Sequence, residues 1–325
     1  MILLDEQLHE IGEIALDVDA EFGSSEEATN DFEFVFSMIA ERGIYPNAFY
    51  IPGTEIGGLI DFAKTKSSSD NLVYRGYTWR GLMSKAIIMP PQGADYMTVS
   101  GEANSIMASM LSGVLGDVFT VSSEDSGLTI TSYQFPLYIN MLDGLEGMLE
   151  AYGYRLKITA QKVASAQPIQ ILVEAVAATI VSGVYNEDNG VPMIYQMDNM
   201  GINHLICGGA GELQARQIID LYLDNMGNIS RTQFYFGIEE RTAFFDYPNA
   251  ESEDDLIDSA IEEFKTLATF KSMAIKAPEN QELEIGDIVR GVFPDGSSLQ
   301  SPVVRKIYKI EHGLLTTECK IKGEE

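Results

Sequence analysis

The residues whose types could support catalysis or metal binding are few, and their spacing does not assemble a known site. The chain has three histidines, His9, His204 and His312, which is little material for proton transfer at neutral pH. His204 and Cys207 are three residues apart, a spacing found in metal sites. The segment between them is typical of a strand, in which positions three apart point to opposite faces. Because no second pair of ligands is in view, we expect no metal and no cofactor.

Three short motifs have both a chemical and a structural interpretation. Residues 208–211, Gly-Gly-Ala-Gly, resemble a phosphate-binding loop but lack its lysine and hydroxyl residue. Asp188-Asn-Gly190 and Asp224-Asn225 offer oxygen ligands for calcium, yet neither has the spacing of a calcium-binding loop. All three patterns are typical of turns. No nucleophile elbow occurs, so we expect a protein that is not an enzyme.

The net charge is the strongest signal in the composition. Acidic residues number 49 against 21 basic ones, which gives a formal net charge of −28. A chain with this net charge repels phosphate, which argues against general nucleic-acid binding. Strong acidity can also serve solubility alone. From Asp5 to Glu41 the acids alternate with apolar residues, and no basic residue precedes Arg42. This period-two pattern predicts half-buried strands with one apolar face and one acidic face.

Basic residues gather in the segment 71–91. It contains the only tryptophan, Trp79, together with Arg75, Arg80 and Lys85. Two β-type runs interrupted by glycine predict a hairpin, and its charge predicts contact with an acidic neighbour. Trp79 could be a recognition platform, but we prefer packing in the core or at a subunit contact, where an aromatic ring buries most area.

The predicted class is α+β, mainly β, in three parts. Short alternating runs predict a first β domain over residues 1–92, completed by about 160–184. Residues 93–160 change character and predict a small α/β insert. Residues 185–325 predict a second β domain with one helix.

Helix periodicity and capping residues place the helices. Apolar spacing predicts one helix over 100–115, with Ser100 as its N-cap, and another over about 137–151. A third is predicted over 252–268, capped by Ser252 and with acids in its first turn. Between the first two, the runs 119–121 and 128–131 predict a hairpin.

Features of secreted and membrane proteins are missing from the sequence. Two cysteines do not form a disulfide framework, and the N-terminus lacks the basic and apolar regions of a signal peptide. No window reaches the roughly 20 apolar residues of a membrane span. We expect synthesis and folding in a cytoplasm.

An ordered set of motifs resembles a phage tail hub, or baseplate hub, family. The first is Tyr74-Arg-Gly-Tyr-Thr-Trp-Arg-Gly-Leu-Met83 followed by Ile87-Ile-Met-Pro-Pro91. It is similar to a hairpin of proteins in siphophage tail tips and phage-tail-like particles, often the N-terminal part of tail-associated proteins. Matching segments follow in order at 201–213, 246–252 and 285–289. Each motif alone is weak, but together they span nearly the whole chain.

This resemblance implies a structural virion protein, a homotrimeric hub that closes the distal end of the tail tube. Each subunit would carry two tail-tube-like β-barrel or sandwich domains, so that three subunits present a pseudo-sixfold ring. The implied partners are a hexameric distal tail or tube protein, the tape measure protein, and tail fibre, spike or lysin proteins. The implied location is the virion tail tip. Because the last predicted strand ends close to Glu325, we expect any wall-degrading activity in another chain.

Within such a hub the acidic and basic residues would have different roles, one in DNA passage and the other in subunit contact. DNA leaving a tail must slide without sticking, and a negative wall repels phosphate whereas a basic wall holds it. We expect acidic strand faces to line the channel, with the candidates Glu13, Asp17, Asp19, Glu21, Asp31 and Glu33. We expect the basic hairpin to contact an acidic surface of a sister subunit or neighbouring ring, with the candidates Arg75, Tyr77, Trp79, Arg80 and Lys85.

Two other classes of function stay open from the sequence. A cell-wall carbohydrate-binding module would use exposed aromatics such as Tyr45, Phe49 and Tyr50 as sugar platforms. A tail-associated peptidoglycan hydrolase would use paired carboxylates. Neither alternative accounts for the ordered resemblance along the chain.

Overall fold

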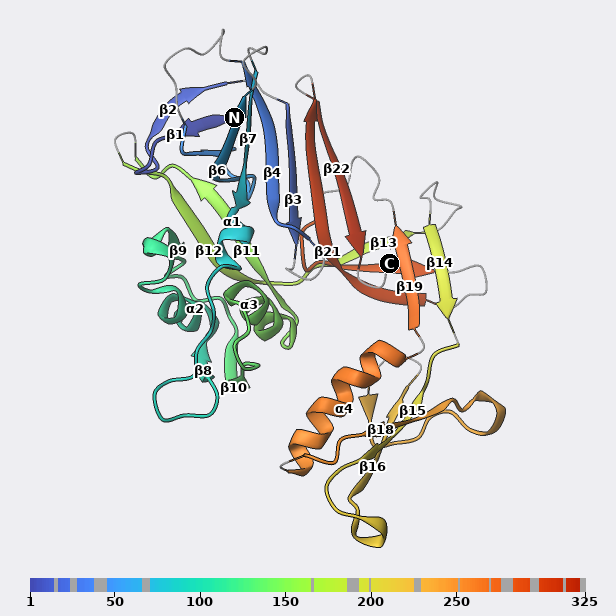
Figure 1. Cartoon of the computed structure of the whole chain (residues 1–325). Coiled ribbons are helices and arrows are strands. Elements are labelled where there is room, and N and C mark those ends of the chain that lie inside the picture. The colour runs from blue at the N-terminus through green and yellow to red at the C-terminus, as the bar shows by residue number, and fades with distance from the viewer. Residues whose placement is uncertain are drawn as a thin grey trace. The chain divides into compact units, whose positions relative to one another are not determined.

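The chain forms two compact units, residues 1–193 with 275–322 (unit 1) and residues 194–274 (unit 2) (Figure 1). The fold is α+β and mainly β, as the sequence predicts. This computed structural model describes residues 1–14, 17–23, 28–37, 46–65, 71–164, 167–185, 193–198, 200–224, 229–250, 252–268, 270–275, 283–292, 298–311 and 314–321.

Unit 1 is built on an eleven-stranded sheet. Its strand order is β13-β20-β21-β3-β4-β7-β6-β5-β1-β2, with β22 paired to β21. The strands are β1 (Ile2–Leu4), β2 (Glu10–Glu13), β3 (Val18–Gly23), β4 (Asp31–Ser37), β5 (Ala48–Tyr50), β6 (Gly57–Thr65), β7 (Asn71–Thr78), β13 (Ile180–Tyr185), β20 (Ile288–Val292), β21 (Ser298–Glu311) and β22 (Leu314–Ile321).

Aromatic side chains on β3 and β4 explain why these strands form. Phe22, Phe32 and Phe34 alternate with acids and are buried on one face of the sheet. The Phe32 and Phe49 rings meet edge to face with centroids 4.6 Å apart, a favoured aromatic geometry. The period-two prediction for these strands is therefore confirmed, and one face carries the core while the other carries the acids.

The segment between β7 and β13 packs helices against small sheets around a separate core (Figure 1). Met107, Leu145, Ile158 and Val173 are all buried there. The helices are α1 (Trp79–Met83), α2 (Ala103–Leu111) and α3 (Met141–Glu150), with a 3-10 turn at Leu115–Asp117. The strands are β8 (Thr98–Glu102), β9 (Phe119–Val121), β10 (Thr129–Gln134), β11 (Tyr154–Gln161) and β12 (Gln170–Ala177).

Helix α2 begins later than predicted because Glu102 caps it. The Glu102 carboxylate accepts hydrogen bonds from the backbone N–H groups of Asn104 and Ser105. Ser100, the predicted cap, lies in β8 instead. Burial opposes ionisation of Glu102, but hydrogen bonds from Ser126 and these N–H groups outweigh it and lower its pKa to about 2. Glu102 is therefore a charged cap at all ordinary pH values.

Helix α3 also begins later than predicted. Asn140 is its N-cap and accepts from the Asp143 N–H at 3.0 Å. Residues 137–139 are not helical: Tyr138 has a φ of 58°, and the Ile139 carbonyl accepts from the Ile88 N–H.

The predicted hairpin over 119–121 and 128–131 is wrong. β9 pairs in parallel with β12, Phe119 opposite Ile171. β10 pairs with β8, Ile130 opposite Gly101. The Ser126 hydroxyl donates to Glu102 and ties the intervening loop to the start of α2, which is compatible with these pairings.

Unit 2 is a four-stranded sheet in the order β17-β16-β15-β18 with one helix. Leu256, Ala260 and Phe264 of α4 are fully buried against Leu205 and Cys207 of the sheet. Ser252 caps α4 as predicted, accepting from the Asp255 N–H. The elements are β15 (His204–Gly208), β16 (Ile218–Leu223), β17 (Ile229–Ser230), β18 (Thr242–Asp246), α4 (Glu253–Leu267) and the 3-10 turns Leu213–Ala215 and Gly237–Glu239. A two-stranded sheet pairs β14 (Met193–Asp198) with β19 (Phe270–Ile275).

The C-terminal strands return to the sheet of the N-terminal strands, because β21 pairs with β3. The division into two tube-like domains with an insert stays a prediction. None of the helices described is long and apolar enough to cross a membrane.

Candidate functional site

The acidic residues of β3 and β4 share one face of the large sheet. In the antiparallel register Asp19 lies opposite Glu33, and Ala20 lies opposite Phe32. Since side chains alternate along a strand, all acids of this set point away from the phenylalanine core. They line an open groove of about 550 Å³. The acids on it are Asp17, Asp19, Glu21, Asp31 and Glu33. We call this surface the acidic face.

Glu13, the sixth candidate acid, lies elsewhere. It is exposed on β2, the last strand at the other end of the sheet order. Its register partner is Ile2 of β1. The structure thus brings five of the six predicted acids together and separates the sixth.

Arg75 lies on the acidic face rather than on a separate basic surface. It stands opposite Glu33 in the β4–β7 register, and its Nε lies 2.5 Å from Glu33 Oε2. The two side chains are 59% and 43% exposed, so water screens the pair and its contribution to stability is at most about 1 kcal/mol. Lys309 of β21 lies opposite Asp19 on the same face. The acidic face is therefore partly neutralised.

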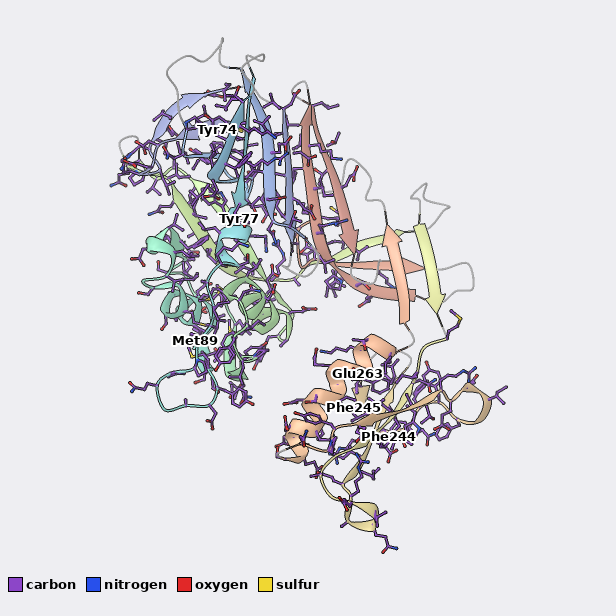
Figure 2. All side chains as sticks on the ribbon, in the orientation of Figure 1. Tyr74, Tyr77, Met89, Phe244, Phe245 and Glu263 are labelled. Carbon is purple, nitrogen blue, oxygen red and sulfur yellow. The ribbon has the colours of Figure 1, made fainter. Side chains whose placement is uncertain are left out.

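The same side of the sheet continues across β7 and β6, where Tyr77 lies opposite Asp31 and Phe62 lies opposite Arg75. The Arg75 guanidinium lies 5.9 Å from the centre of the Phe62 ring, and Lys85 Nζ lies 4.1 Å from that of Tyr77. Both are cation–π contacts. Phe62 is 45% exposed and Tyr77 38% exposed; Figure 2 labels Tyr77.

Trp79 lies in the core, which agrees with the packing interpretation. It begins α1 and is fully buried, so the second strand of the predicted hairpin is wrong. The chain turns there because the Thr78 hydroxyl caps α1 and donates to the Asn30 carbonyl. Gly57 leaves room for the indole: a Cβ at that position would lie 2.6 Å from Trp79 Nε1.

Arg80 is also buried, and its guanidinium joins three elements of unit 1. Nε donates to Glu55 at 2.9 Å, Nη1 to Glu146 at 2.6 Å, and Nη2 to the Leu156 carbonyl at 3.0 Å. Burial opposes the charge of Arg80, but the two carboxylates outweigh it and raise its pKa. With side chains only 2% and 0% exposed, Arg80 and Trp79 support the fold of the subunit. The exposed members of the predicted contact set are Arg75, Tyr77 and Lys85.

Glu146 is the most perturbed carboxyl group of this cluster. Burial raises its pKa to about 7 despite the opposing charge of Arg80, and the neighbouring Asp143 and Glu55 raise it further. A cavity of about 260 Å³ borders it, lined also by Asp143 and Glu150. These three carboxyl groups come from successive turns of α3 and therefore occupy one wall. A glycosidase places its two carboxyl groups on either side of the scissile bond, which this wall does not do.

His204 and Cys207 point to opposite sides of the unit 2 sheet, as the strand spacing predicts. Cys207 is buried against α4. His204 Nδ1 lies 2.6 Å from Glu240 Oε1, and Nε2 lies 2.8 Å from Asp220 Oδ1. Within the residues that the structure describes, no group of three or more His, Cys, Asp or Glu side chains could hold a metal ion.

The other predicted motifs lie in turns, in the core or outside the residues that the structure describes. Gly208 ends β15, and the rest of 208–211 forms the turn after it. Asp188-Asn-Gly190, Asn225 and Tyr45 lie outside the described residues. Phe49 and Tyr50 are fully buried, so they are not surface platforms for sugar.

Comparisons with known proteins identify the fold. No family model matches the sequence, and no curated protein is significantly similar to it. Prophage tail protein gp18 from Listeria monocytogenes superposes with a TM-score of 0.50 at 12% identity, covering 100% of this chain and 95% of that one. The 43 kDa tail protein of prophage MuSo2 from Shewanella oneidensis gives 0.51 at 10% identity, covering 96% and 95%. The chain has the fold of a phage tail protein.

The phage tail fold here extends over the full chain, because both matches cover nearly all of this chain and of the solved proteins. The resemblance inferred from ordered motifs is confirmed at the level of fold. Sequence reasoning missed Glu55 and Glu146, the partners of Arg80. No local signal marks them, because they lie 25 and 66 residues away in the chain.

Proposed function

We propose that this chain is a structural phage tail protein, a trimeric hub that closes the distal end of the tail tube and joins it to the tail tip or baseplate. In the tail tip its neighbours would be a hexameric distal tail or tube protein, the tape measure protein, and fibre, spike or lysin proteins. The fold shared with prophage tail proteins supports a tail role.

The single observation that carries the channel part of this proposal is the acidic face. Five carboxylates sit on one side of a continuous sheet whose other side is core. A trimer that turns this face inward would surround passing DNA with negative charge. Repulsion would act over roughly a Debye length, about 8 Å at physiological salt. DNA would then pass without specific binding.

Light scattering on the purified protein across a concentration series tests the oligomer. We expect a trimer, or a monomer–trimer equilibrium that shifts with concentration. Adding a hexameric distal tail or tube protein of the same particle should drive a monomeric preparation to trimers, because a sixfold ring is a template for three two-domain subunits. A protein that stays monomeric with the tube protein present would overturn the hub.

A further inference from the structure

Strand β18 lies at one edge of the unit 2 sheet. The strand order is β17-β16-β15-β18, so β15 is the one neighbour of β18 among the strands that the structure describes. The two strands are parallel, and their register runs without a bulge from His204 opposite Thr242 to Gly208 opposite Asp246. All five residues of β18 are therefore in register with β15, and the other side of the strand faces away from the sheet.

Two hydrogen bonds at the ends of β18 determine which of its backbone groups point outward. Just before the strand, the Arg241 carbonyl accepts from the His204 N–H at 3.0 Å. Just after it, the Tyr247 N–H donates to the Gly208 carbonyl at 2.8 Å. In a parallel pair, every second residue of a strand turns its N–H and C=O to the same neighbour. The odd-numbered residues of β18 therefore bond to β15.

The even-numbered residues, Thr242, Phe244 and Asp246, present their N–H and C=O groups at the outer edge. Within the described part of the chain, no group forms a hydrogen bond with the backbone of these three residues. All three are exposed, Phe244 at 55%. The edge thus offers a donor and an acceptor at every second residue, which is the pattern that another extended strand satisfies.

This edge carries little protection against pairing. Natural edge strands are often blocked by lysine, proline, a bulge or a very short length. The sequence of β18 is Thr-Ala-Phe-Phe-Asp, and its one charged residue, Asp246, is the last of the strand and forms an ion pair with Arg216. By contrast β17, at the other edge, has only the two residues Ile229–Ser230. The sheet is therefore open to a further strand on the β18 side.

Phe244 is held in place although it is exposed; Figure 2 labels it on β18. A Cβ on Gly208 would lie 2.7 Å from Phe244 Cζ, so the ring lies against backbone that only glycine leaves bare. The Arg216 guanidinium lies 5.5 Å from the centre of the ring. A ring that is fixed before binding loses little conformational entropy when a partner covers it, which is the character of an interface anchor.

The turn before β18 adds further exposed apolar side chains. Phe236 is 64% exposed and Ile238 91% exposed. The Asn203 side chain holds this turn, because its amide donates to the Glu239 carbonyl at 2.8 Å and accepts from the Arg241 N–H at 2.8 Å. Exposed apolar residues therefore lead from this ordered turn into the free edge, which favours a partner segment with apolar side chains.

We propose that the free edge of β18 binds an extended, apolar segment of another tail protein, which adds a fifth strand to the unit 2 sheet. The backbone of Thr242, Phe244 and Asp246 supplies the hydrogen bonds, and the Phe244 ring supplies the anchor. Two β18 edges paired with each other would make a closed twofold contact, which does not fit a threefold hub. This inference rests on the proposed function and names the kind of partner that unit 2 holds.

Hydrogen–deuterium exchange on the isolated full chain and on assembled particles tests the proposal. The amides of Thr242, Phe244 and Asp246 should exchange quickly in the dilute isolated chain. In particles they should exchange about tenfold or more slowly, because a partner strand accepts from them. The exposed amides of Glu253 and Asp254 in the first turn of α4 are the matched reference and should exchange alike in both samples.

Two variants separate the backbone of the edge from the ring. Phe244→Pro removes the outward N–H of this residue and none of the bonds to β15, a position at which an edge strand tolerates proline. Phe244→Ala removes the ring and keeps the N–H. In particles, Phe244→Pro should lose the protection at Thr242 and Asp246, whereas Phe244→Ala should retain part of it. Circular dichroism and melting temperature show whether each variant keeps the fold.

The outcomes distinguish this inference from the proposed function. If the chain is present in particles and its edge amides exchange as fast as in the isolated chain, the inference is overturned and the tail role stands. Protection that survives Phe244→Pro also overturns pairing along the edge. Protection that develops in the isolated chain as its concentration rises would assign the edge to a second copy and overturn the proposed partner. A chain that is absent from the particles overturns both.

Discussion

Arg80 concentrates more interactions than any other side chain of the basic segment. One guanidinium satisfies two carboxylates and one carbonyl, in an interior where Arg80 is 2% exposed. Removing one partner of a buried ion pair leaves the other charges uncompensated, which costs far more than the pair contributes.

Replacing Arg80 by methionine should therefore destabilise the protein by about 3–5 kcal/mol in urea unfolding. Arg80→Lys should recover only part of that loss, because lysine cannot reach three acceptors with a planar fork. Arg75→Met is the matched control on an exposed pair and should cost less than about 1 kcal/mol. Equal losses of unfolding free energy for Arg80→Met and Arg75→Met would show that the buried network contributes no more to stability than the exposed ion pair.

The raised pKa of Glu146 makes the free energy of unfolding depend on pH. Its pKa is raised to about 7 in the folded chain, chiefly by burial, from an ordinary value of 4.5. Between these values the folded state binds up to one proton more than the unfolded state, so stability falls as pH rises from about 4.5 to about 7. Glu146→Gln should flatten the stability profile in that range. A profile that keeps its slope between about pH 4.5 and 7 in Glu146→Gln would contradict this role of Glu146.

At the scale of elements, caps decide where the helices begin. Glu102 anchors α2 and also binds Ser126, which positions β10. Glu102→Ala should cost about 1 kcal/mol of stability, the usual worth of an N-cap, and Ser100→Ala should cost a few tenths at most because Ser100 is no cap. Since the Glu102 pKa is lowered to about 2, its contribution should persist at pH 5 and disappear only as pH falls from about 4.5 toward 2. A loss of the mutational effect already at pH 6 would contradict the charged cap.

The helix with the clearest pattern, α4, could be predicted almost to the residue, because Ser252, the acids after it and the apolar spacing agree. The strands β3 and β4 follow equally well from alternation. The pairings of β9 and β10 could not be predicted from the sequence. Residues 119–121 and 128–131 are both short apolar runs with a turn between them, which is the pattern of a hairpin. Each pairs instead with a strand outside that run, β12 and β8, and the bond from Ser126 to Glu102 fastens the loop between them to the start of α2. The pattern predicts a strand at Trp79, because nothing local distinguishes that run from a helix of five residues.

At the scale of the whole molecule, the proposed function depends on the fold and on the acidic face. The ordered sequence motifs predict the tail fold. The alternation of apolar and acidic residues predicts that the acids of β3 and β4 share one face of the sheet. Register alone revealed that Arg75 and Lys309 share it too, because strand partners are set by the entire sheet.

Charge reversal on the acidic face should impair DNA passage without impairing assembly. Particles carrying Asp19→Lys and Asp31→Lys should assemble normally but eject DNA more slowly, with a defect that shrinks at high salt. Asp254→Lys, an exposed acid on α4, should leave ejection unchanged. Normal ejection kinetics in the acidic-face variant at low salt would remove the electrostatic role.

The most direct test of the central claim is an electron cryomicroscopy map of the assembled tail tip, into which the chain is fitted by its own density. We predict three copies around the tail axis with Asp19, Glu21 and Asp31 turned toward the channel. A map in which those carboxylates lie on the outer wall, or in which the chain lies away from the axis, would contradict the account.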